Sequence, residues 1–254
     1  MFRTCNNEIL IRLFAYLIRK EMTASNSQHL LDNPIWNSLT THHARFSQGG
    51  ELARRFDPEI GPLAGIRDQS PEAYQELGEL LAPNQVAVLF LDTPPEPPPG
   101  WTLKLHLPGD QMICERTIAT PSNDFATWQL GDADVVEMLE LTKLTDPGPF
   151  RKRTIELGTF LGIRENGRLA AMAGQRLALP GLTEVSGVCT HPDFRGRGYA
   201  EALVTAVMQI IRERGEASIL HVFSSNNTAI RVYESLGFVL RRKLHITAVI
   251  PPAA

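Results

Sequence analysis

Apolar positions in the second half of the chain follow helical and strand periods in turn. The run 198–214 carries apolar residues at helical spacing and ends before Gly215, which predicts an amphipathic helix. Shorter apolar runs predict strands near 157–163 and 169–175. The turn sequence Glu165-Asn166-Gly167 between these runs predicts that the two strands form a hairpin.

The same part of the chain contains further alternating elements. Strands are predicted at 184–190 and 218–223, and a last strand or strand pair at 238–250. Helices are predicted at 132–144, with Val135, Val136, Leu139 and Leu141 near one face, and at 227–236. Strands and helices in this order indicate an α/β (α+β) fold with a mixed central sheet flanked by helices.

The first half is less regular. Ser70-Pro71-Glu72 is typical of a helix start, and Pro83 ends that helix. The apolar run 86–91 predicts a buried strand, and the alternation over 101–107 predicts a half-exposed one. Between them, 93–100 contains five prolines, which indicates a loop, with a proline-rich docking ligand as the alternative.

A polar, turn-rich stretch over 119–124 is the predicted joint between the two halves. We therefore predict a smaller N-terminal α/β domain of unassigned role over 23–122 and a more regular domain over 123–254. Residues 1–22 are predicted to be an N-terminal extension.

The extension is apolar but is interrupted by Arg12, and no clear small-residue cleavage site follows it. A secretory signal is therefore disfavoured. The segment is too short to span a bilayer and is predicted to be an amphipathic helix, or an extension upstream of an alternative start at Met22.

Composition narrows the class of protein. Apolar residues make up 43% of the chain and charged residues 21%, as in ordinary soluble proteins. The net charge of −3 gives no basic surplus for binding nucleic acid. Cys5, Cys114 and Cys189 are odd in number and far apart, which favours a reducing compartment over a disulfide framework. We expect a cytoplasmic protein without a bound metal, and with neither nucleic acid nor a membrane as a partner.

One run carries recognisable chemistry. Between the strand at 184–190 and the helix at 198–214 lies a turn with Arg195, Gly196, Arg197 and Gly198. This turn favours a phosphate-bearing anion for three reasons. The helix start offers backbone amides, the glycines let a ligand approach the backbone, and the two arginines add positive charge. A charged, flexible helix start is the simpler alternative.

Other phosphate-binding motifs fit this run poorly. A dinucleotide-binding turn needs a third glycine where Glu201 stands, and its carboxylate would repel a pyrophosphate. The P-loop string does not occur in the sequence.

Two motifs resemble the GNAT superfamily of N-acetyltransferases. The strand at 184–190, followed by Arg195-x-x-Gly198-x-Ala200, resembles its motif A. The spacing Asn226-x-x-Ala229-x-x-x-Tyr233-x-x-x-Gly237-Phe238 resembles its motif B. Within the superfamily the chain resembles the FR-type subgroup, which is named for a Phe-Arg pair, here Phe194-Arg195. The resemblance covers roughly 125–250, and the first half, which matches no motif, could be a degenerate copy of the same fold.

The resemblance implies a GNAT-like fold and acetyl-CoA as the acyl donor. Turn amides would hold the CoA pyrophosphate, and the backbone of the preceding strand would pair with the pantetheine arm. The implied donor-binding residues are Val188, Cys189, Thr190, Arg195, Gly196, Arg197, Gly198, Tyr199, Ala200, Asn226 and Ala229.

It also implies roles in the reaction. Glu184 would act as general base, directly or through water, and the alternative is a carboxylate facing solvent. Tyr233 would protonate the leaving thiolate, and the alternative is a packing residue. The amide of Val188 or a neighbour would stabilise the oxyanion. Phe150 would line the acceptor pocket or anchor its own loop.

Two other residues could attract a catalytic interpretation. His191 precedes a proline and is predicted to be a loop feature rather than a base. Cys189 lies in an apolar strand and is predicted to be a buried structural thiol rather than a nucleophile.

The leading hypothesis is an acetyl-CoA-dependent N-acetyltransferase acting on a primary amine of a small molecule or a protein. The alternatives are an acyl-CoA sensor without catalysis and an N-acyltransferase for longer acyl chains. The sequence leaves the acceptor and the oligomeric state open.

Overall fold

The computed structural model describes residues 29–114 and 125–253. The predicted extension over 1–22 and the predicted joint over 119–124 lie outside the described residues. Asn33–Ala254 form one compact unit. The short 3-10 helix η1 (Leu30–Asp32) precedes this unit and belongs to a separate one.

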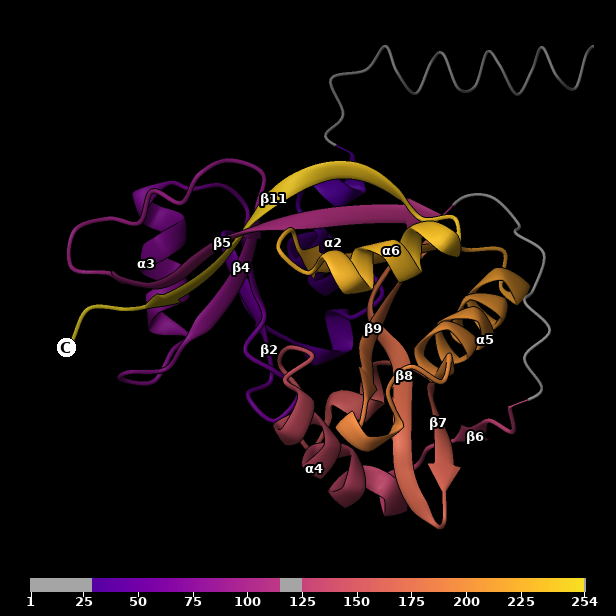
Figure 1. Cartoon of the computed structure of the whole chain (residues 1–254). Helices are drawn as coiled ribbons and strands as arrows, with labels where there is room; N and C mark the ends of the chain where they lie inside the picture. Colours follow the sequence, from indigo (N-terminus) through magenta and orange to yellow (C-terminus); the bar gives the residue numbers. More distant parts are fainter. Residues whose placement is uncertain (1–28, 115–124, 254) are drawn as a thin grey trace, which may run out of the picture. The chain divides into compact units, whose positions relative to one another are not determined.

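A mixed eight-stranded sheet runs through the compact unit (Figure 1). Its spatial order is β4-β11-β5-β10-β9-β8-β7-β6. The strands are β4 (Ala87–Leu91), β5 (Thr102–Cys114), β6 (Trp128–Gln129), β7 (Phe160–Glu165), β8 (Arg168–Leu179), β9 (Leu182–Thr190), β10 (Ala217–Phe223) and β11 (Val239–Ile250).

Neighbouring strands in this sheet are antiparallel except for β9 and β10, which are parallel. Parallel neighbours need a crossover connection, and α5 (Tyr199–Glu213) provides it. The predicted fold class is therefore confirmed. The last predicted strand region is a single long strand, β11, with a bulge between Leu240 and Arg242.

Strand β5 has an unusual place in this order. It lies between β10 and β11, although both strands follow it by more than a hundred residues of sequence. β5 pairs with β10 over 109–114 and with β11 over 102–113. The sheet thus extends across the predicted boundary at 122, and the division into two domains stays a prediction.

The N-terminal block, defined as residues 33–114, also contacts a loop of the second half. The Arg153 amide donates to the Glu59 carbonyl at 3.0 Å, and Thr154 Oγ1 donates to the Ile60 carbonyl at 2.7 Å. Arg153 Nη1 lies 3.1 Å from the Asp57 carboxylate. Backbone and side-chain bonds therefore join the two halves beyond the shared sheet.

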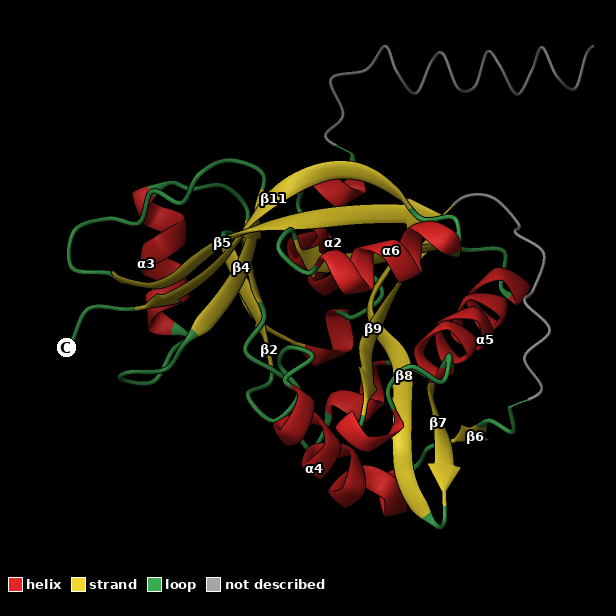
Figure 2. Ribbon diagram, viewed as in Figure 1, coloured by secondary structure: helices red, strands yellow, loops and turns green. Residues whose placement is uncertain are grey.

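Helices cover the sheet on both sides (Figure 2). They are α2 (Pro34–Thr40), α3 (Pro71–Glu79), α4 (Val135–Thr145), α5 and α6 (Asn227–Ser235), with short 3-10 helices η2 (Ala44–Phe46), η3 (Asp132–Asp134), η4 (Thr154–Leu157) and η5 (Pro192–Phe194). None of the described helices is long and apolar enough to cross a membrane.

Two apolar clusters pack against the central strands. Leu203 and Val207 of α5 belong to one cluster, and Met138 and Leu141 of α4 belong to the other. The sequence prediction for α4 was wrong about Val136, which is 66% exposed. The buried positions of α4 are Val135, Met138, Leu141 and Thr142, a narrower stripe than the predicted one.

The N-terminal block contains a second, antiparallel sheet of β1 (Ser47–Gly49), β2 (Ala53–Phe56) and β3 (Ala64–Ile66). The predicted helix start at Ser70 is confirmed, because its side chain accepts a bond from the Ala73 amide at 3.3 Å. Apolar residues of α3 and of this sheet pack on the end of β4 and β11. The predicted proline-rich loop is also a loop in the structure.

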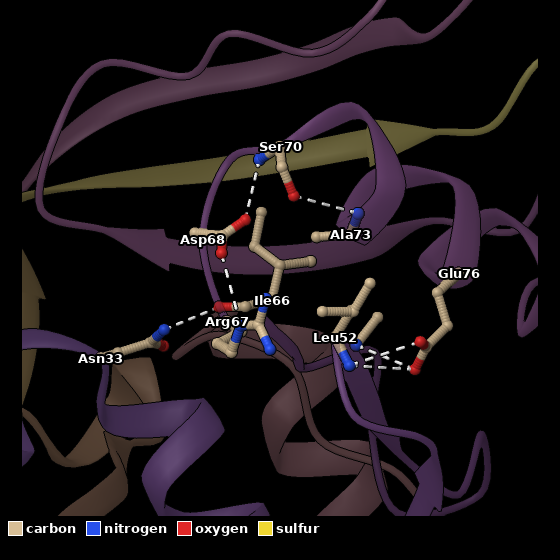
Figure 3. A network of polar contacts seen from close by, with 9 residues as sticks. Asn33, Leu52, Ile66, Arg67, Asp68, Ser70, Ala73 and Glu76 are labelled. Carbon is tan, nitrogen blue, oxygen red and sulfur yellow. Dashed lines mark hydrogen bonds and ion pairs between the residues drawn. The ribbon is translucent and has the colours of Figure 1, made fainter.

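A carboxylate on α3 holds the turn that leads into β2 (Figure 3). Glu76 Oε1 accepts bonds from the amides of Gly50 and Ala53 at 3.0 Å, and both its oxygens lie 3.3 Å from the Leu52 amide. The Ala53 bond, and then those from Leu52 and Gly50, lower the pKa of the Glu76 carboxyl, although partial burial acts in the opposite direction.

We expect Glu76→Gln to lower the free energy of unfolding at pH 7 by about 1 to 3 kcal/mol, because an amide group replaces one acceptor oxygen facing these N–H groups. Because the pKa of Glu76 is lower in the folded state than in the unfolded state, the carboxylate stabilises the fold at any pH above its unfolded pKa. This contribution is lost as the pH falls through the folded pKa. The difference should therefore shrink below a pH of about 4.3.

Urea unfolding followed by circular dichroism at several pH values measures this difference. Glu79→Gln, an exposed change on the same helix, is the matched control. Equal destabilisation by both substitutions would contradict the role of Glu76.

Candidate functional site

The site is built where β9 leads through a tight turn into α5. Gly198 is the N-cap of α5 and has a φ of 82°, and Gly196 has a φ of 76°. Residues with side chains rarely adopt this left-handed conformation. The turn therefore needs glycine at both positions. It leaves the first amides of α5 without a partner inside the helix, at the positive end of its dipole.

Two arginines add positive charge to this turn. Arg195 and Arg197 are both exposed. Arg195 Nε donates to the Thr190 carbonyl at 3.4 Å, and the Arg197 guanidinium lies 5.1 Å from the centre of the Phe194 ring. Amides, helix dipole and guanidinium groups all favour an anion at this point.

A cavity of about 430 Å³ opens beside the turn. It brings together every residue predicted to bind the donor, together with Tyr233. These residues are Val188, Cys189, Thr190, Arg195, Gly196, Arg197, Gly198, Tyr199, Ala200, Asn226, Ala229 and Tyr233. The motif that ends at Ala200 and the motif that begins at Asn226 thus line one space.

The strands β9 and β10 separate next to this cavity. Their paired residues run from Ala217 with Leu182 to Ile219 with Glu184, where the β9–β10 ladder ends. β10 stays paired with β5 through Phe223, and β9 stays paired with β8 through Thr190. The segment of β9 after Glu184 therefore turns one edge toward the cavity, as the resemblance implied for Val188.

Tyr233 lines the cavity from α6. Its side chain is buried, with 9% of the residue exposed, and its ring packs at 6.0 Å against that of Phe238. Burial, and then the nearby Cys189, raise the pKa of the Tyr233 phenol to about 12. This hydroxyl therefore stays protonated at any physiological pH and can serve as a proton donor.

Polar side chains also order the two helix starts that border the cavity. Asn226 Oδ1 accepts a bond from the Ala229 amide at 3.2 Å and caps α6. The Tyr199 hydroxyl donates to the Glu165 carboxylate, which raises the pKa of that phenol. Both contacts fix the backbone of the cavity wall.

Glu184 is fully buried instead of facing solvent. Arg176 donates to both of its oxygens, at 2.7 and 2.8 Å, and His221 Nδ1 lies 2.8 Å from Oε1. Burial alone would raise the pKa of this carboxyl, but the Arg176 ion pair and the His221 bond hold it well below its usual range. The role predicted for Glu184 as base stays a prediction, and this geometry disfavours its direct contact with an amine.

The other candidates have structural contacts. His191 Nδ1 accepts from the Asp193 amide at 3.2 Å, which agrees with a loop feature. Cys189 is buried, and burial raises the pKa of its thiol to about 11. The Phe150 ring packs at 5.5 Å on Phe160 and so anchors its loop; its contact with an acceptor stays a prediction.

The sequence analysis missed Arg176 and His221, which bond Glu184 in the structure, and Gln111, which bonds His221. A hairpin signal could have placed Arg176 near Glu184, because the adjacent residues Gln175 and Val185 pair across the turn at Gly181. His221 lies in an apolar strand, and a buried imidazole there implies a polar partner.

Comparison with known protein sequences gives two relevant matches. The family model of FR47-like proteins matches residues 160–246. The [Ribosomal protein bS18]-alanine N-acetyltransferase of Escherichia coli strain K12 is 34% identical over 89 residues, which are 34% of this chain. The match spans 60% of the length of that relative.

Solved structures resemble a larger share of the chain. A protein named as an acetyltransferase from the GNAT family of Novosphingobium aromaticivorans is 41% identical, with a TM-score of 0.82. The match covers 89% of this chain and 100% of that one. A GCN5-related N-acetyltransferase from Kribbella flavida shares the fold at 15% identity and a TM-score of 0.59, over 87% of this chain and 96% of that one.

We expect Gly198→Ala to lower the free energy of unfolding by about 1 to 2 kcal/mol, because a Cβ disfavours the left-handed conformation at the start of α5. Urea unfolding measures the change. Gly61→Ala is the control, since no atom lies within 4 Å of a Cβ there and its φ is not left-handed. A stability equal to that of Gly61→Ala would contradict the role of this turn.

Proposed function

Since this chain belongs to the GNAT family of acetyltransferases, we propose that it moves an acetyl group from acetyl-CoA to the amine of an acceptor. The observation that carries the proposal is the cavity at the start of α5, which residues of both sequence motifs line. A CoA pyrophosphate fits the turn chemically. Free amides, a helix dipole and two guanidinium groups favour its charge, and no atom lies within 4 Å of a Cβ built on Gly196.

The pantetheine arm would lie between the separated strands. The edge of β9 from Val188 to Thr190 offers backbone groups there, and Ala229 and Asn226 border the other side. Main-chain contacts of this kind resemble the addition of a strand to a sheet. An amide on this edge of β9 would also donate to the oxyanion that develops on the thioester carbonyl.

The proposed reaction is direct transfer. The amine nitrogen attacks the thioester carbonyl carbon, the carbon–sulfur bond breaks, and the sulfur leaves with the electron pair. Tyr233 gives its hydroxyl proton to that sulfur, while the proton of the amine passes to water, which reprotonates the phenolate. In water a thiol with a pKa of about 8.5 is more acidic than this phenol, but burial at the same place raises the thiol pKa as well.

The geometry of Glu184 supports a choice of acceptor. Its carboxylate is bound to Arg176 and His221, so we propose that the amine arrives already neutral. At pH 8 an α-amine with a pKa of about 7.7 to 8.0 is roughly half neutral, whereas a lysine side chain of pKa about 10.4 is only about 0.4% neutral. An α-amino group of a peptide or protein is therefore the proposed acceptor, as the name of the E. coli relative also suggests.

We expect Tyr233→Phe to lower kcat by about tenfold or more, because the leaving thiolate loses its proton donor. The Kd for acetyl-CoA should stay within about twofold of the wild-type value, since the donor is held by backbone groups. Release of free thiol from acetyl-CoA measures kcat, and calorimetry measures the Kd.

The control is Tyr74→Phe, which removes another phenol whose pKa burial raises to about 12, far from the cavity. Equal turnover by wild type and Tyr233→Phe would contradict the acid role. Tight acetyl-CoA binding by the wild type without thiol release on any amine would favour a sensor. Competition among acyl-CoA chain lengths separates an acetyltransferase from an enzyme for longer chains.

We expect two peptides of one sequence to react differently at pH 8. One has a free N-terminal alanine and an acetylated lysine; the other has a blocked N-terminus and a free lysine. The free α-amine should give a kcat/KM at least about tenfold higher, because far more of it is neutral. Mass spectrometry of the product locates the acetyl group, and faster acetylation of the lysine would contradict the proposed acceptor.

A further inference from the structure

A row of polar side chains crosses the sheet from β11 to β8. Arg241 Nη1 donates to Gln111 Oε1 at 2.7 Å, and Gln111 Nε2 lies 3.0 Å from His221 Nε2. His221 Nδ1 lies 2.8 Å from Glu184 Oε1, and Arg176 donates to both Glu184 oxygens. Each of the five neighbouring strands β11, β5, β10, β9 and β8 contributes one residue.

The contacts fix the state of the imidazole in this row. Because the Gln111 oxygen accepts from Arg241, its nitrogen is the group that faces His221 and donates to Nε2. Nδ1 is then the ring nitrogen that donates to Glu184. The side chains of Glu184 and His221 are 0% and 1% exposed, which keeps water from competing for these bonds.

The row crosses from β9 to β10 where their backbone pairing ends. Glu184 is the last residue of β9 in the ladder, and His221 lies two residues beyond its partner Ile219 on β10. The Glu184–His221 bond is therefore a side-chain bridge just past the point where the strands separate. Within the described residues, the backbone pairing of β9 with β10 ends at Glu184 and Ile219, so this bridge constrains the width of the opening.

The N-terminal block supplies two contacts to the bridge. Gln111 comes from β5, and Phe90 of β4 places its ring 4.8 Å from that of His221. The Arg176 guanidinium lies 5.7 Å from the centre of the Phe90 ring, on the other side of the bridge. Phe90 is 6% exposed and so packs the imidazole and the guanidinium together. This part of the chain carries neither GNAT-like motif.

We propose that His221 is a positioning residue, which bridges to Glu184 to set the opening between β9 and β10, and that the N-terminal block orients it through Gln111 and Phe90. The proposal rests on the proposed function, because that opening is the place assigned to the pantetheine arm. It gives the first half of the chain a part in acetyl transfer without any contact with the donor.

The physical reason is the need for alignment in the transfer step. The β9 edge from Val188 to Thr190 and Tyr233 on α6 face the thioester from two sides of the opening. A change in the distance between β9 and β10 moves these groups relative to each other. Reacting groups displaced by about 1 Å can lose roughly a hundredfold in rate.

The test compares His221→Leu with His221→Asn. Leucine removes both hydrogen bonds, whereas the asparagine amide can replace Nδ1 as the donor to Glu184 but cannot take up a proton. We expect His221→Leu to lower kcat about tenfold or more and to raise the Kd for acetyl-CoA about fivefold. His221→Asn should recover most of both losses, and its kcat should keep the wild-type dependence on pH.

Different outcomes contradict different claims. If the asparagine variant is as inactive as the leucine variant while both bind acetyl-CoA like the wild type, His221 moves a proton and the positioning proposal is overturned. Wild-type values for both variants would overturn it as well. A wild type that neither binds acetyl-CoA nor releases thiol would instead refute the proposed function itself.

A second pair of variants tests the N-terminal block and remains informative if His221→Leu does not fold. Phe90→Leu keeps an apolar side chain in place but removes the ring that packs on His221, and should raise the Kd for acetyl-CoA about threefold. Leu89→Met, at the preceding residue of β4, which belongs to the apolar cluster with α3, is the control and should bind like the wild type. Equal affinity of the two variants would contradict the role of Phe90.

Discussion

Beyond Ile219, β10 is paired with β5 along one edge and no longer with β9 along the other, and this unequal pairing opens the sheet beside the cavity. A strand that leaves its neighbour in a sheet exposes backbone groups on that side, which normally need another partner. β10 can leave β9 after Ile219 because β5 holds its opposite edge through Phe223. The opening between β9 and β10 thus coexists with an intact ladder between β10 and β5.

This pairing gives the first half of the chain a part in the sheet that borders the cavity. β5 enters the sheet between β10 and β11, and with β4 it extends the side of the sheet away from the cavity. Residues of the second half line the proposed donor site. Strand β10, which borders the opening, is held along its other edge by β5 of the first half. The row from Arg241 to Arg176 then joins the same strands by their side chains.

Local features of the sequence predicted much of this structure. The periods of α3, α5 and α6, the turn at Asn166 and the cap at Ser70 depend on near neighbours, and the structure contains all of them. The FR47-like match over 160–246 and the GNAT structural relative confirm the resemblance seen in the two motifs. Phosphate-binding turns and helix caps are recognisable because their residues are adjacent in sequence.

What the sequence did not predict depends on distant partners. The place of β5 follows from strands about a hundred residues away, which no local pattern specifies. The environment of Glu184 was missed for the same reason. The local sequence around a carboxylate at a strand start is the same whether its side chain faces solvent or bonds Arg176 and His221. The exposed Val136 shows that an apolar residue inside a helix can still face outward.

The buried thiol of Cys189 has a consequence for chemical selectivity. It stands in the wall of the cavity where a reactive thioester is proposed to lie, and a thiolate there would accept the acyl group. With a pKa of about 11 this thiol is ionised in only about one molecule in several thousand at pH 7.5. Transfer of the acyl group from the donor to Cys189 is thereby suppressed. A cysteine can therefore occupy this buried position of β9 without consuming acetyl-CoA.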